Sequence, residues 1–500
     1  MPDSSGLQPY LFPLTGGLHL DRSAFAIEPG MALELENFEP DTSGGYRRIN
    51  GYNKWDSDVV PFTTAPTEPV LMSAFFQGHV IAARGESIYK SSGSGWTSID
   101  SGRTGAKRYS FIRFNFTGSE IIAFADGANQ ASYWDGTTFS DVNTSGAPSD
   151  PHYIQVHKNT GFYAGMSANP NEIVYTAPLT LDDFNVANGA GSFVIDSAVT
   201  GMIGFRESLY IFSSSRIYEL VGSSAADYQL KPVTREIGCR NGWTIKEFAG
   251  DVVFLGPDGL RTIAGTAKIG DVDLGTISKP VQRLFQGKED VDDFTSIIIP
   301  NKTQYRIFFG KEDVLRENTE GVICSRKAEG YEFSTTRGIR PASSDTEEYL
   351  GSFYIMIGGF DGYVYRLEEG NTFDGETIIG RYRSPDLNAG DPGLRKAFQR
   401  VVINYAPEGE VNSDLFLRYD YEAPNVPRPE PYPFDSTQVV ALYGTSKYGV
   451  ATYGGQTDPL VRQPVEGSGF AVALRVVDNG VSVPYSLKGF QLEFTVAARR

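Results

Sequence analysis

The sequence has 500 residues, of which 40% are hydrophobic, 13% aromatic and 21% charged, with 55 glycines and 28 prolines. This composition is too aromatic for a disordered chain and too rich in turn residues for a helical bundle, so it indicates an all-β protein. The formal net charge of −17 argues against a broad basic surface that binds nucleic acid by neutralising phosphates.

The first 69 residues form a segment without regular periodicity. The chain opens on Met1-Pro2-Asp3-Ser4 without the basic start and apolar core of a signal peptide, and no stretch approaches the ~18 apolar residues of a membrane span. We therefore expect synthesis in the cytoplasm and no membrane span. The segment nevertheless carries many apolar side chains: Phe12, Leu14, Leu18, Leu20, Phe25, Ile27, Phe38 and Tyr46. Residues 1–69 are thus predicted to be an extended assembly segment, which lies on an adjacent subunit or closes the domain that follows.

Residues 70–375 break into short apolar or alternating runs separated by Gly, Asn, Asp and Ser, as expected for strands joined by hairpins. The first unit shows the pattern clearly. Its predicted strands cover residues 71–76, 79–83, 87–90 and 96–99. Such a meander is one antiparallel four-stranded sheet.

An apolar-Tyr pair marks the third strand of this unit and recurs along the chain. Tyr89, Tyr133, Tyr175 and Tyr218 are spaced by 44, 42 and 43 residues. Later repeats place Arg261, the run 321–324 and Tyr365 at the equivalent position, with residues 266–288 as an insertion. A period of about 40 to 45 residues with four strands each is typical of a β-propeller. The sequence therefore predicts six or seven four-stranded blades, the alternative being a sandwich with accidental spacing.

Residues 376–500 have a different character. Strand-like segments at 377–383, 397–405, 414–421, 470–477 and 490–497 predict a separate C-terminal β-sandwich domain. A Pro-rich stretch at residues 423–433 and a Tyr/Gly stretch at 443–455 interrupt it. Because proline resists both helix and central strand, the Pro-rich stretch is predicted to be an extended arm that reaches a neighbouring molecule.

Motifs for chemistry are missing from the sequence. It contains no nucleophile elbow, zinc helix, phosphate-binding loop or calcium loop, so we expect no catalytic residue, no metal and no cofactor. His152 and His157 are predicted to face opposite sides of a strand, and Cys239 and Cys324 to be buried thiols. The carboxylate pairs Asp182-Asp183 and Asp292-Asp293 precede apolar strands and are interpreted as turn residues.

A basic cluster stands out in the C-terminal region, because five cations lie within twenty residues: Arg381, Arg383, Arg395, Lys396 and Arg400. Arginine forks bind carboxylate-rich protein surfaces or phosphates. The cluster is therefore a candidate subunit interface, the alternative being ordinary solvated side chains.

The opening segment carries a resemblance to a known family. Residues 16–23 (GGLHLDRS), 27–30 (IEPG), 35–40 (LENFEP) and 44–52 (GGYRRINGY), followed by the repeat, resemble the start of bacteriophage tail hub or nozzle proteins, also called packaged-DNA stabilisation proteins. Residues 379–383 and 393–398 are similar to the β domain that follows the propeller in that family. Members of the family can carry six-bladed propellers, whereas the repeat counted here has seven units.

The resemblance implies a non-enzymatic structural protein of the virion tail. It would form a homo-oligomeric ring of six copies that retains packaged DNA and lets double-stranded DNA pass without sequence-specific contact. Its partners would be an adaptor on the portal side and tail fibres or a plug protein. The N-terminal segment adds further candidate interface residues to the basic cluster: Phe25, Phe38, Tyr46, Arg47 and Arg48.

Two other functions stay open at this point. One is a propeller of a tail spike that binds or hydrolyses glycans, for which Asp183 and Asp293 would be the carboxylates to test. The other is a cellular propeller scaffold, which the phage-like opening disfavours.

Overall fold

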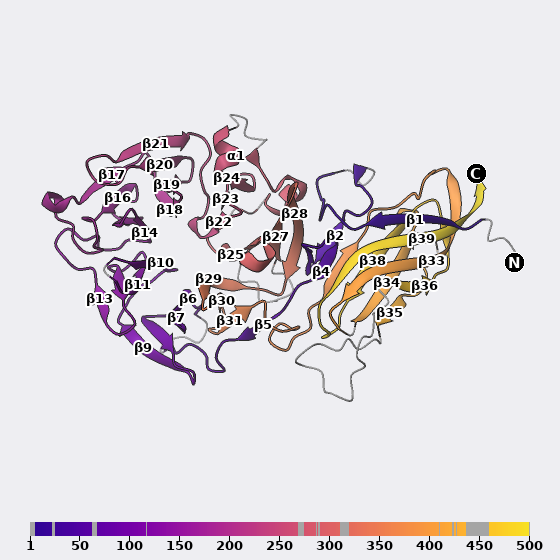
Figure 1. Ribbon diagram of the computed structural model, residues 1–500, viewed down its shortest axis with the longest axis horizontal. Helices are drawn as coiled ribbons and strands as arrows, with labels where there is room; N and C mark the ends of the chain where they lie inside the picture. The colour runs from indigo at the N-terminus through magenta and orange to yellow at the C-terminus, as the bar shows by residue number, and fades with distance from the viewer. Residues whose placement is uncertain are drawn as a thin grey trace.

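The computed structural model describes residues 6–22, 26–62, 68–116, 118–268, 275–286, 288, 291–310, 320–409, 411–422, 425–426, 428–436 and 460–499. Strands dominate it, and they build a ring of sheets joined to a sandwich of two sheets (Figure 1). The prediction of an all-β propeller followed by further C-terminal sheets is confirmed. No helix in the described part of the chain is long and apolar enough to cross a membrane.

The first four blades are separate four-stranded antiparallel sheets whose strands follow in chain order. Their strands are β6 (Met72–Phe76), β7 (His79–Arg84), β8 (Ser87–Ser91) and β9 (Trp96–Ser101); β10 (Ser110–Asn115), β11 (Glu120–Ala125), β12 (Ser132–Trp134) and β13 (Phe139–Asp141); β14 (Tyr153–His157), β15 (Thr160–Ala164), β16 (Glu172–Tyr175) and β17 (Gly191–Val194); β18 (Val199–Phe205), β19 (Ser208–Ser213), β20 (Ile217–Val221) and β21 (Gln229–Thr234).

The remaining three positions of the ring are less uniform. One is a three-stranded sheet, one belongs to a larger nine-stranded sheet, and the last takes its outer strand from the N-terminal segment. The strands are β22 (Lys246–Phe248), β23 (Asp251–Leu255) and β24 (Leu260–Thr262); β25 (Thr295–Ile299), β26 (Gln304–Phe308), β27 (Glu320–Lys327) and β28 (Gly330–Arg337); β29 (Pro341–Tyr349), β30 (Ser352–Gly359), β31 (Val364–Leu367) and β5 (Tyr52–Lys54).

Every predicted repeat position lies on the third strand of its sheet. Tyr89, Tyr133, Tyr175 and Tyr218 lie on β8, β12, β16 and β20, and the later positions lie on β24, β27 and β31. The described residues thus form six sheets of three or four strands that stand alone, and β25–β28 fill a seventh position. The glycines of the Asp-Gly turns, including Gly127 and Gly362, have positive φ as tight hairpins require.

Apolar packing between successive sheets explains why the repeats close into a ring. The first two blades share one buried cluster around Phe76 and Trp134, and Met356 of β30 packs with Phe75 of β6 in another. Burying an apolar face against each neighbour leaves no blade face open to water. The last sheet is completed when β31 pairs with β5, so a strand from before the propeller closes the ring.

One sheet of the propeller differs from the predicted four strands, because β22–β24 is three-stranded within the described residues. Where the fourth strand would follow, the described chain forms the short helix α1 (Ile263–Lys268) and the 3₁₀ helix η5 (Lys279–Leu284). Thr276 forms a single bridge with Arg261 on β24. Within the described residues of the predicted insertion 266–288, two short helices and this bridge thus stand where a regular fourth strand was expected.

The sandwich consists of two facing sheets around a common core. One contains β1 (Gln8–Pro13), β3 (Phe38–Pro40), β4 (Tyr46–Arg48), β33 (Leu394–Pro407), β36 (Leu460–Pro464), β37 (Ser468–Gly469) and β39 (Tyr485–Arg499). The other contains β2 (Glu34–Glu36), β32 (Gly380–Arg383), β34 (Val411–Tyr419), β35 (Tyr432–Ser436) and β38 (Val472–Asp478). The strands predicted from residues 376–500 match β32, β33, β34, β38 and β39.

The N-terminal segment contributes to both parts of the molecule. β1, β3 and β4 belong to the first sandwich sheet, β2 to the second, and β5 to the last blade. β2 pairs in parallel with β28 of the propeller and antiparallel with β32 of the sandwich. One nine-stranded sheet therefore runs from a blade into the sandwich, and Figure 1 shows β2 between the two parts.

The Pro-rich stretch, predicted to be an extended arm that reaches a neighbouring molecule, differs in part from that prediction. Its end enters β35, where Tyr432 and Pro433 pair with Leu415 and Asp414 of β34. β35 is an edge strand, and an edge tolerates proline because the missing N–H can face solvent. Residues 423, 424 and 427, and the Tyr/Gly stretch 443–455, lie outside the described residues.

Candidate functional site

The aromatic residues predicted at a subunit interface lie in the interior of the single chain. Phe38 and Tyr46 are fully buried in the sandwich core. The Phe38 ring packs edge-on against Tyr485, with ring centroids 5.9 Å apart. The Tyr46 hydroxyl donates to the Gly30 carbonyl at 2.7 Å. Phe25 lies outside the described residues.

The basic residues predicted at an interface each have a partner within the chain. Arg48 is buried and pairs with Asp478, and Lys396 is buried and donates to the carbonyls of Asp391 and Leu394. The other partners are Glu39 and Glu408 for Arg47, Glu36 for Arg381, Glu422 for Arg383, Ser468 for Arg395, and Glu493 for Arg400. The residues do not converge on one surface site. A contact with another subunit through the exposed ones stays a prediction.

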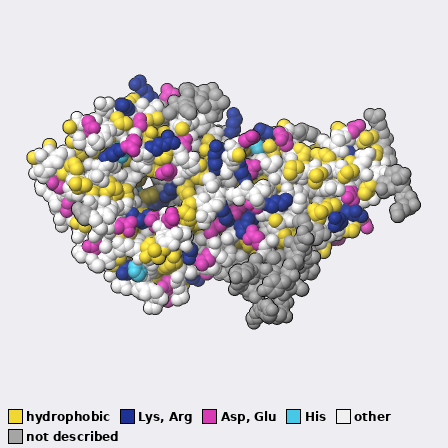
Figure 2. All heavy atoms as spheres, in the orientation of Figure 1, with side chains coloured by type: hydrophobic (Ala, Val, Ile, Leu, Met, Phe, Trp, Pro, Cys, Tyr) yellow, Lys and Arg dark blue, Asp and Glu magenta, His cyan; other side chains and the backbone are white. Residues whose placement is uncertain are grey.

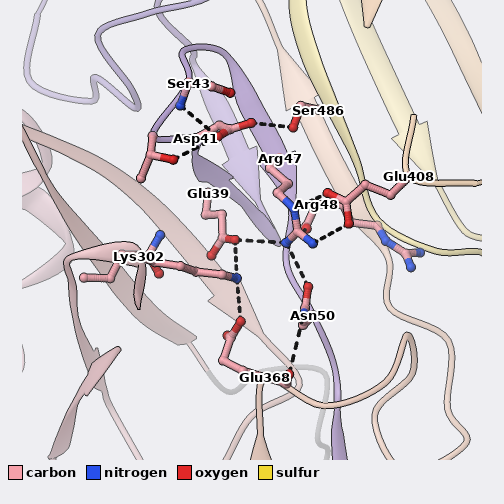
Figure 3. Close-up of polar contacts among 12 residues, drawn as sticks. Glu39, Asp41, Ser43, Arg47, Arg48, Asn50, Lys302, Glu368, Glu408 and Ser486 are labelled. Atoms are coloured by element: carbon pink, nitrogen blue, oxygen red, sulfur yellow. Dashed lines mark hydrogen bonds and ion pairs between the residues drawn. The ribbon is translucent and has the colours of Figure 1, made fainter. Parts of the chain in front are cut away.

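An ionic network that is mostly buried joins the sandwich to two blades, and we call it the junction network (Figure 3). It consists of Glu39, Arg47, Lys302, Arg306, Glu368 and Glu408. The Glu39 carboxylate, 2% exposed, lies 2.9 Å from Arg306 and 2.5 Å from Lys302. Glu368 lies 2.7 Å from Arg306 and 2.5 Å from Lys302.

The local fold explains why these charges meet. Glu39 and Arg47 lie opposite each other on β3 and β4 of the sandwich. Lys302 lies in the turn η6 (Pro300–Lys302) before β26, Arg306 lies on β26, and Glu368 follows β31. Three cations therefore face three carboxylates, counting Glu408, which pairs with Arg47. Burial of ions costs several kcal/mol each, and opposite charges in close contact offset this cost.

The carboxyl group of Glu368 shows how strongly the neighbouring cations act within the network. Burial alone would raise the pKa of its carboxyl, but the charges of Arg306 and Lys302 outweigh burial and hold the pKa below its usual range. The carboxylate is thus stabilised in its charged form. The junction network therefore connects the sandwich to two blades through ion pairs that are mostly buried.

The second buried polar region is the hollow centre of the propeller. Three adjoining cavities of about 430, 270 and 500 Å³ follow one another there. The first two share Arg108 and Trp243, and the second and third share Lys246 and Asp345. Figure 2 shows the propeller face hollowed near its centre. We call the middle cavity, of about 270 Å³, the central cavity.

The innermost strands supply the walls of the central cavity. Arg113 lies on β10, Lys246 on β22 and Asp345 on β29, and Arg108 lies just before β10. Alternation along a strand directs every second side chain toward the same face. In a propeller, residues of the first strand in each sheet therefore surround the axis.

Trp243 is fixed at the junction of the first two cavities. It lies in the 3₁₀ turn η3 (Gly242–Thr244), and its own backbone N–H donates to the Asn241 side chain at 2.7 Å. Ser296 on β25 donates to the Trp243 carbonyl at 2.9 Å. The Arg108 guanidinium lies over the indole ring, 5.3 Å from its centroid. The Tyr153 ring lies 6.1 Å from the same indole.

The charges of the central cavity are unequally paired. Arg113 pairs with both Asp345 and Glu347, the latter at 3.0 Å. Arg108 donates to the carbonyls of Phe294 and Asp293 and forms no ion pair within the described residues. Burial lowers the pKa of Arg108 to about 10 and also lowers the pKa of Lys246. Both shifts mean that the surroundings do not compensate the positive charge fully.

No group of three His, Cys, Asp or Glu side chains that could hold a metal ion occurs in the described part of the chain. Asp183 accepts from Asn185 and Asn188, and Asp182 accepts from Thr180, so this pair caps a turn as predicted. Asp292 and Asp293 occupy a turn before β25 and line the first cavity.

The two cysteines are free and buried, as predicted. Burial raises the pKa of the Cys239 thiol to about 11, so it is protonated at neutral pH. Thiolate chemistry therefore has no support at this position.

Sequence reasoning did not single out Arg108, Trp243 or Lys246. The sequence did contain information that could have located these residues. The repeat marks the third strand of each sheet, and the first strand of the same sheet lies two strands earlier in the chain. Charged residues in a first strand would face the propeller axis, and Arg113, Lys246 and Asp345 are such residues.

No protein-family model and no curated protein matches this sequence. Among solved structures, the extracellular domain described as that of a one component system from B. thetaiotaomicron matches 69% of this chain, with 10% identity and a TM-score of 0.42. An ancestral GH74 enzyme matches 68% of this chain, with 11% identity and a TM-score of 0.41. This chain spans 43% and 50% of the lengths of those two proteins. The likeness concerns the fold alone.

Proposed function

We propose that this protein is a non-enzymatic structural subunit of a phage tail hub or nozzle. Copies of it assemble into a ring in the virion tail, hold packaged DNA and let it leave. The proposal rests on the resemblance of residues 16–52 to that family, and on what this segment does in the fold.

The observation that carries the proposal is the dual role of the N-terminal segment. The residues that bear the resemblance supply β2, β3 and β4 to the sandwich and β5 to the last blade. A continuous sheet and the junction network then tie the two parts together. A subunit that must keep its shape within a loaded tail benefits from such a fixed joint, whereas an enzyme that closes on its substrate needs a hinge.

Electron microscopy of the purified full-length chain, with mass measurement in solution, tests this proposal. We expect closed rings of several copies and no turnover of polysaccharides. Antibody labelling of intact phage particles should then place the protein at the distal end of the tail. A protein that is monomeric at all concentrations and missing from virions would overturn the proposal.

A glycan-binding propeller is the second candidate, and one observation favours it. The first cavity combines the rings of His152, Tyr153 and Trp243 with Asp292 and Asp293, a mixture of aromatic walls and polar groups that suits a sugar. Glycan-array binding, and its loss in Asp293→Asn but not in Asp183→Asn, would support this function. Asp183 is the matched control because its carboxylate is exposed and caps a turn.

A further inference from the structure

We propose that the central cavity of the propeller is a binding site for a small molecule that carries a carboxylate or phosphate group, with Lys246 and Arg108 as the residues that bind this oxyanion. The inference concerns the interior of one chain and does not depend on ring assembly. It would hold for a tail protein and for a glycan-binding protein alike.

Lys246 is the first of the two cations proposed to bind the oxyanion. It lies on the innermost strand β22, is partly buried, and lines both the central cavity and the third cavity. Its ammonium makes no hydrogen bond and no ion pair with any residue that the structure describes. Burial disfavours the charged form of this ammonium, and the through-space attraction of Asp345 does not offset burial fully. An anion that binds the ammonium would therefore stabilise it.

Arg108 provides a second cation at the same cavity. Two of its five N–H donors are used by the carbonyls of Phe294 and Asp293, and its plane lies over Trp243. These contacts hold the guanidinium in place, and none of them is an ion pair with a carboxylate. Remaining donors on a fixed guanidinium are suited to a planar carboxylate or a phosphate.

The carboxylates nearby are already engaged. Asp345 accepts from the backbone N–H of Phe75 and from Arg113. Glu347 pairs with Arg113 at 3.0 Å. Glu247 follows Lys246 on the strand, is exposed, and lines the central and third cavities beside it. Asp293 and Asp292 attract Arg108 through space, and Asp345 attracts Lys246 in the same way. Lys246 and Arg108 are nevertheless the two cations of the central cavity that form no ion pair within the described residues.

The size and walls of the cavity restrict the ligand. About 270 Å³ is room for a small molecule, and the adjoining cavities of about 430 and 500 Å³ allow its neutral part to extend along the propeller axis. Tyr153 and Trp243 offer flat apolar surfaces beside the cations. Phosphorylated metabolites and acidic sugars share this chemistry, and the experiment below separates them.

Isothermal titration calorimetry of the full-length protein, in a buffer without phosphate or carboxylate, tests the site. The probes are inorganic phosphate, glucuronate, and glucose as the neutral counterpart of glucuronate. We expect at least one of the two anions to bind, and glucose to bind at least tenfold more weakly than glucuronate where glucuronate binds. Preference for phosphate over glucuronate points to phosphorylated ligands, and the reverse preference points to acidic sugars.

Substitutions then assign the binding to the cavity. Lys246→Met is expected to weaken binding of the anion about 10- to 100-fold, and Lys246→Arg to retain it within a few-fold, because a charge-assisted hydrogen bond is lost in the first variant alone. Lys231→Met is the matched control, because Lys231 is an exposed lysine on the outer strand β21. Circular dichroism and thermal melting confirm that the variants are folded.

Three results would overturn the inference. The first is that neither anion binds at concentrations up to about ten millimolar, which lies well above the range of specific sites. The second is equal binding of glucose and glucuronate, because the site would then not recognise charge. The third is anion binding that survives Lys246→Met unchanged or falls equally in Lys231→Met. None of these results bears on ring assembly, so failure here is distinguishable from failure of the proposed tail function.

Discussion

The junction network and the central cavity are both buried and charged, but they treat their charges differently. At the junction, Glu39 and Glu368 are held between Arg306 and Lys302 at ion-pair distances. In the cavity, Lys246 has no such partner within the described residues. Buried charges that pair with each other favour one arrangement of the chain. A buried charge without an ion-pair partner can instead be stabilised by a ligand of opposite charge, and such a ligand would stabilise the folded protein.

The largest expected effect concerns the segment that creates the junction. A chain that starts at residue 55 lacks β1–β4 and β5, so the sandwich loses strands from both sheets and the last blade loses its outer strand. We expect this chain to aggregate or to unfold at all temperatures tested. A chain that starts at Leu7 keeps every one of these strands and should be folded. Soluble, cooperatively unfolding protein from the shorter chain would show that the segment is an accessory to the fold.

The next effect is on the matched charges themselves. Glu39→Gln leaves Arg306 and Lys302 facing a neutral side chain in a buried site, and we expect a loss of about 3–5 kcal/mol in the free energy of unfolding. Urea denaturation measures this loss. Glu408→Gln removes a carboxylate that is 44% exposed and should cost less than about 1 kcal/mol. Equal losses would mean that burial of the junction is unimportant.

A smaller effect is the pH dependence of the stability that the junction network contributes. The pKa of Glu368 is lower in the folded protein than in the unfolded chain, so its contribution is fully present above the unfolded value of about 4.3 and is lost as pH falls toward the folded pKa. Stability should therefore fall on acidification more steeply in the wild type than in Glu368→Gln. Denaturation at a series of pH values between about 6 and 3 compares the two slopes. Parallel slopes would contradict the assigned pKa shift.

The smallest effect on the free energy of unfolding is expected at Lys246, and this effect is a gain in stability instead of a loss. Lys246→Met removes an uncompensated cation from the cavity wall, so without ligand the free energy of unfolding should rise by about 1 kcal/mol. The exposed control Lys231→Met should change it by less than about 0.5 kcal/mol. A destabilised Lys246→Met protein would indicate that the ammonium already has a favourable partner.

Local patterns were sufficient to predict the propeller. The recurrence of Tyr89, Tyr133 and Tyr175 reflects a repeated packing position on the third strand, and such periodicity is visible in one sequence. The structure between β24 and β25 was not predictable in the same way, because the described residues there form the short helices α1 and η5, which do not follow the repeat.

Long-range pairing was out of reach of those patterns. Residues 34–36 form only a three-residue strand, and nothing local indicates that it pairs with both β28 and β32 across the sequence. For the same reason Arg48 and Lys396 were placed at an interface, whereas their partners lie far along the chain or on the backbone within it. Whether a charge is paired depends on tertiary structure, and the sequence alone shows only that the charge exists.

The most direct test of the contrast between matched and unmatched buried charge is the sign of two changes in stability. Urea denaturation of Glu39→Gln and Lys246→Met, in one buffer free of phosphate and carboxylate, gives both values against the same wild type. We expect a clear loss of stability for Glu39→Gln and a gain for Lys246→Met. A loss in both variants would contradict the contrast between the two sites, since Lys246 would then be one more charge that the fold itself stabilises.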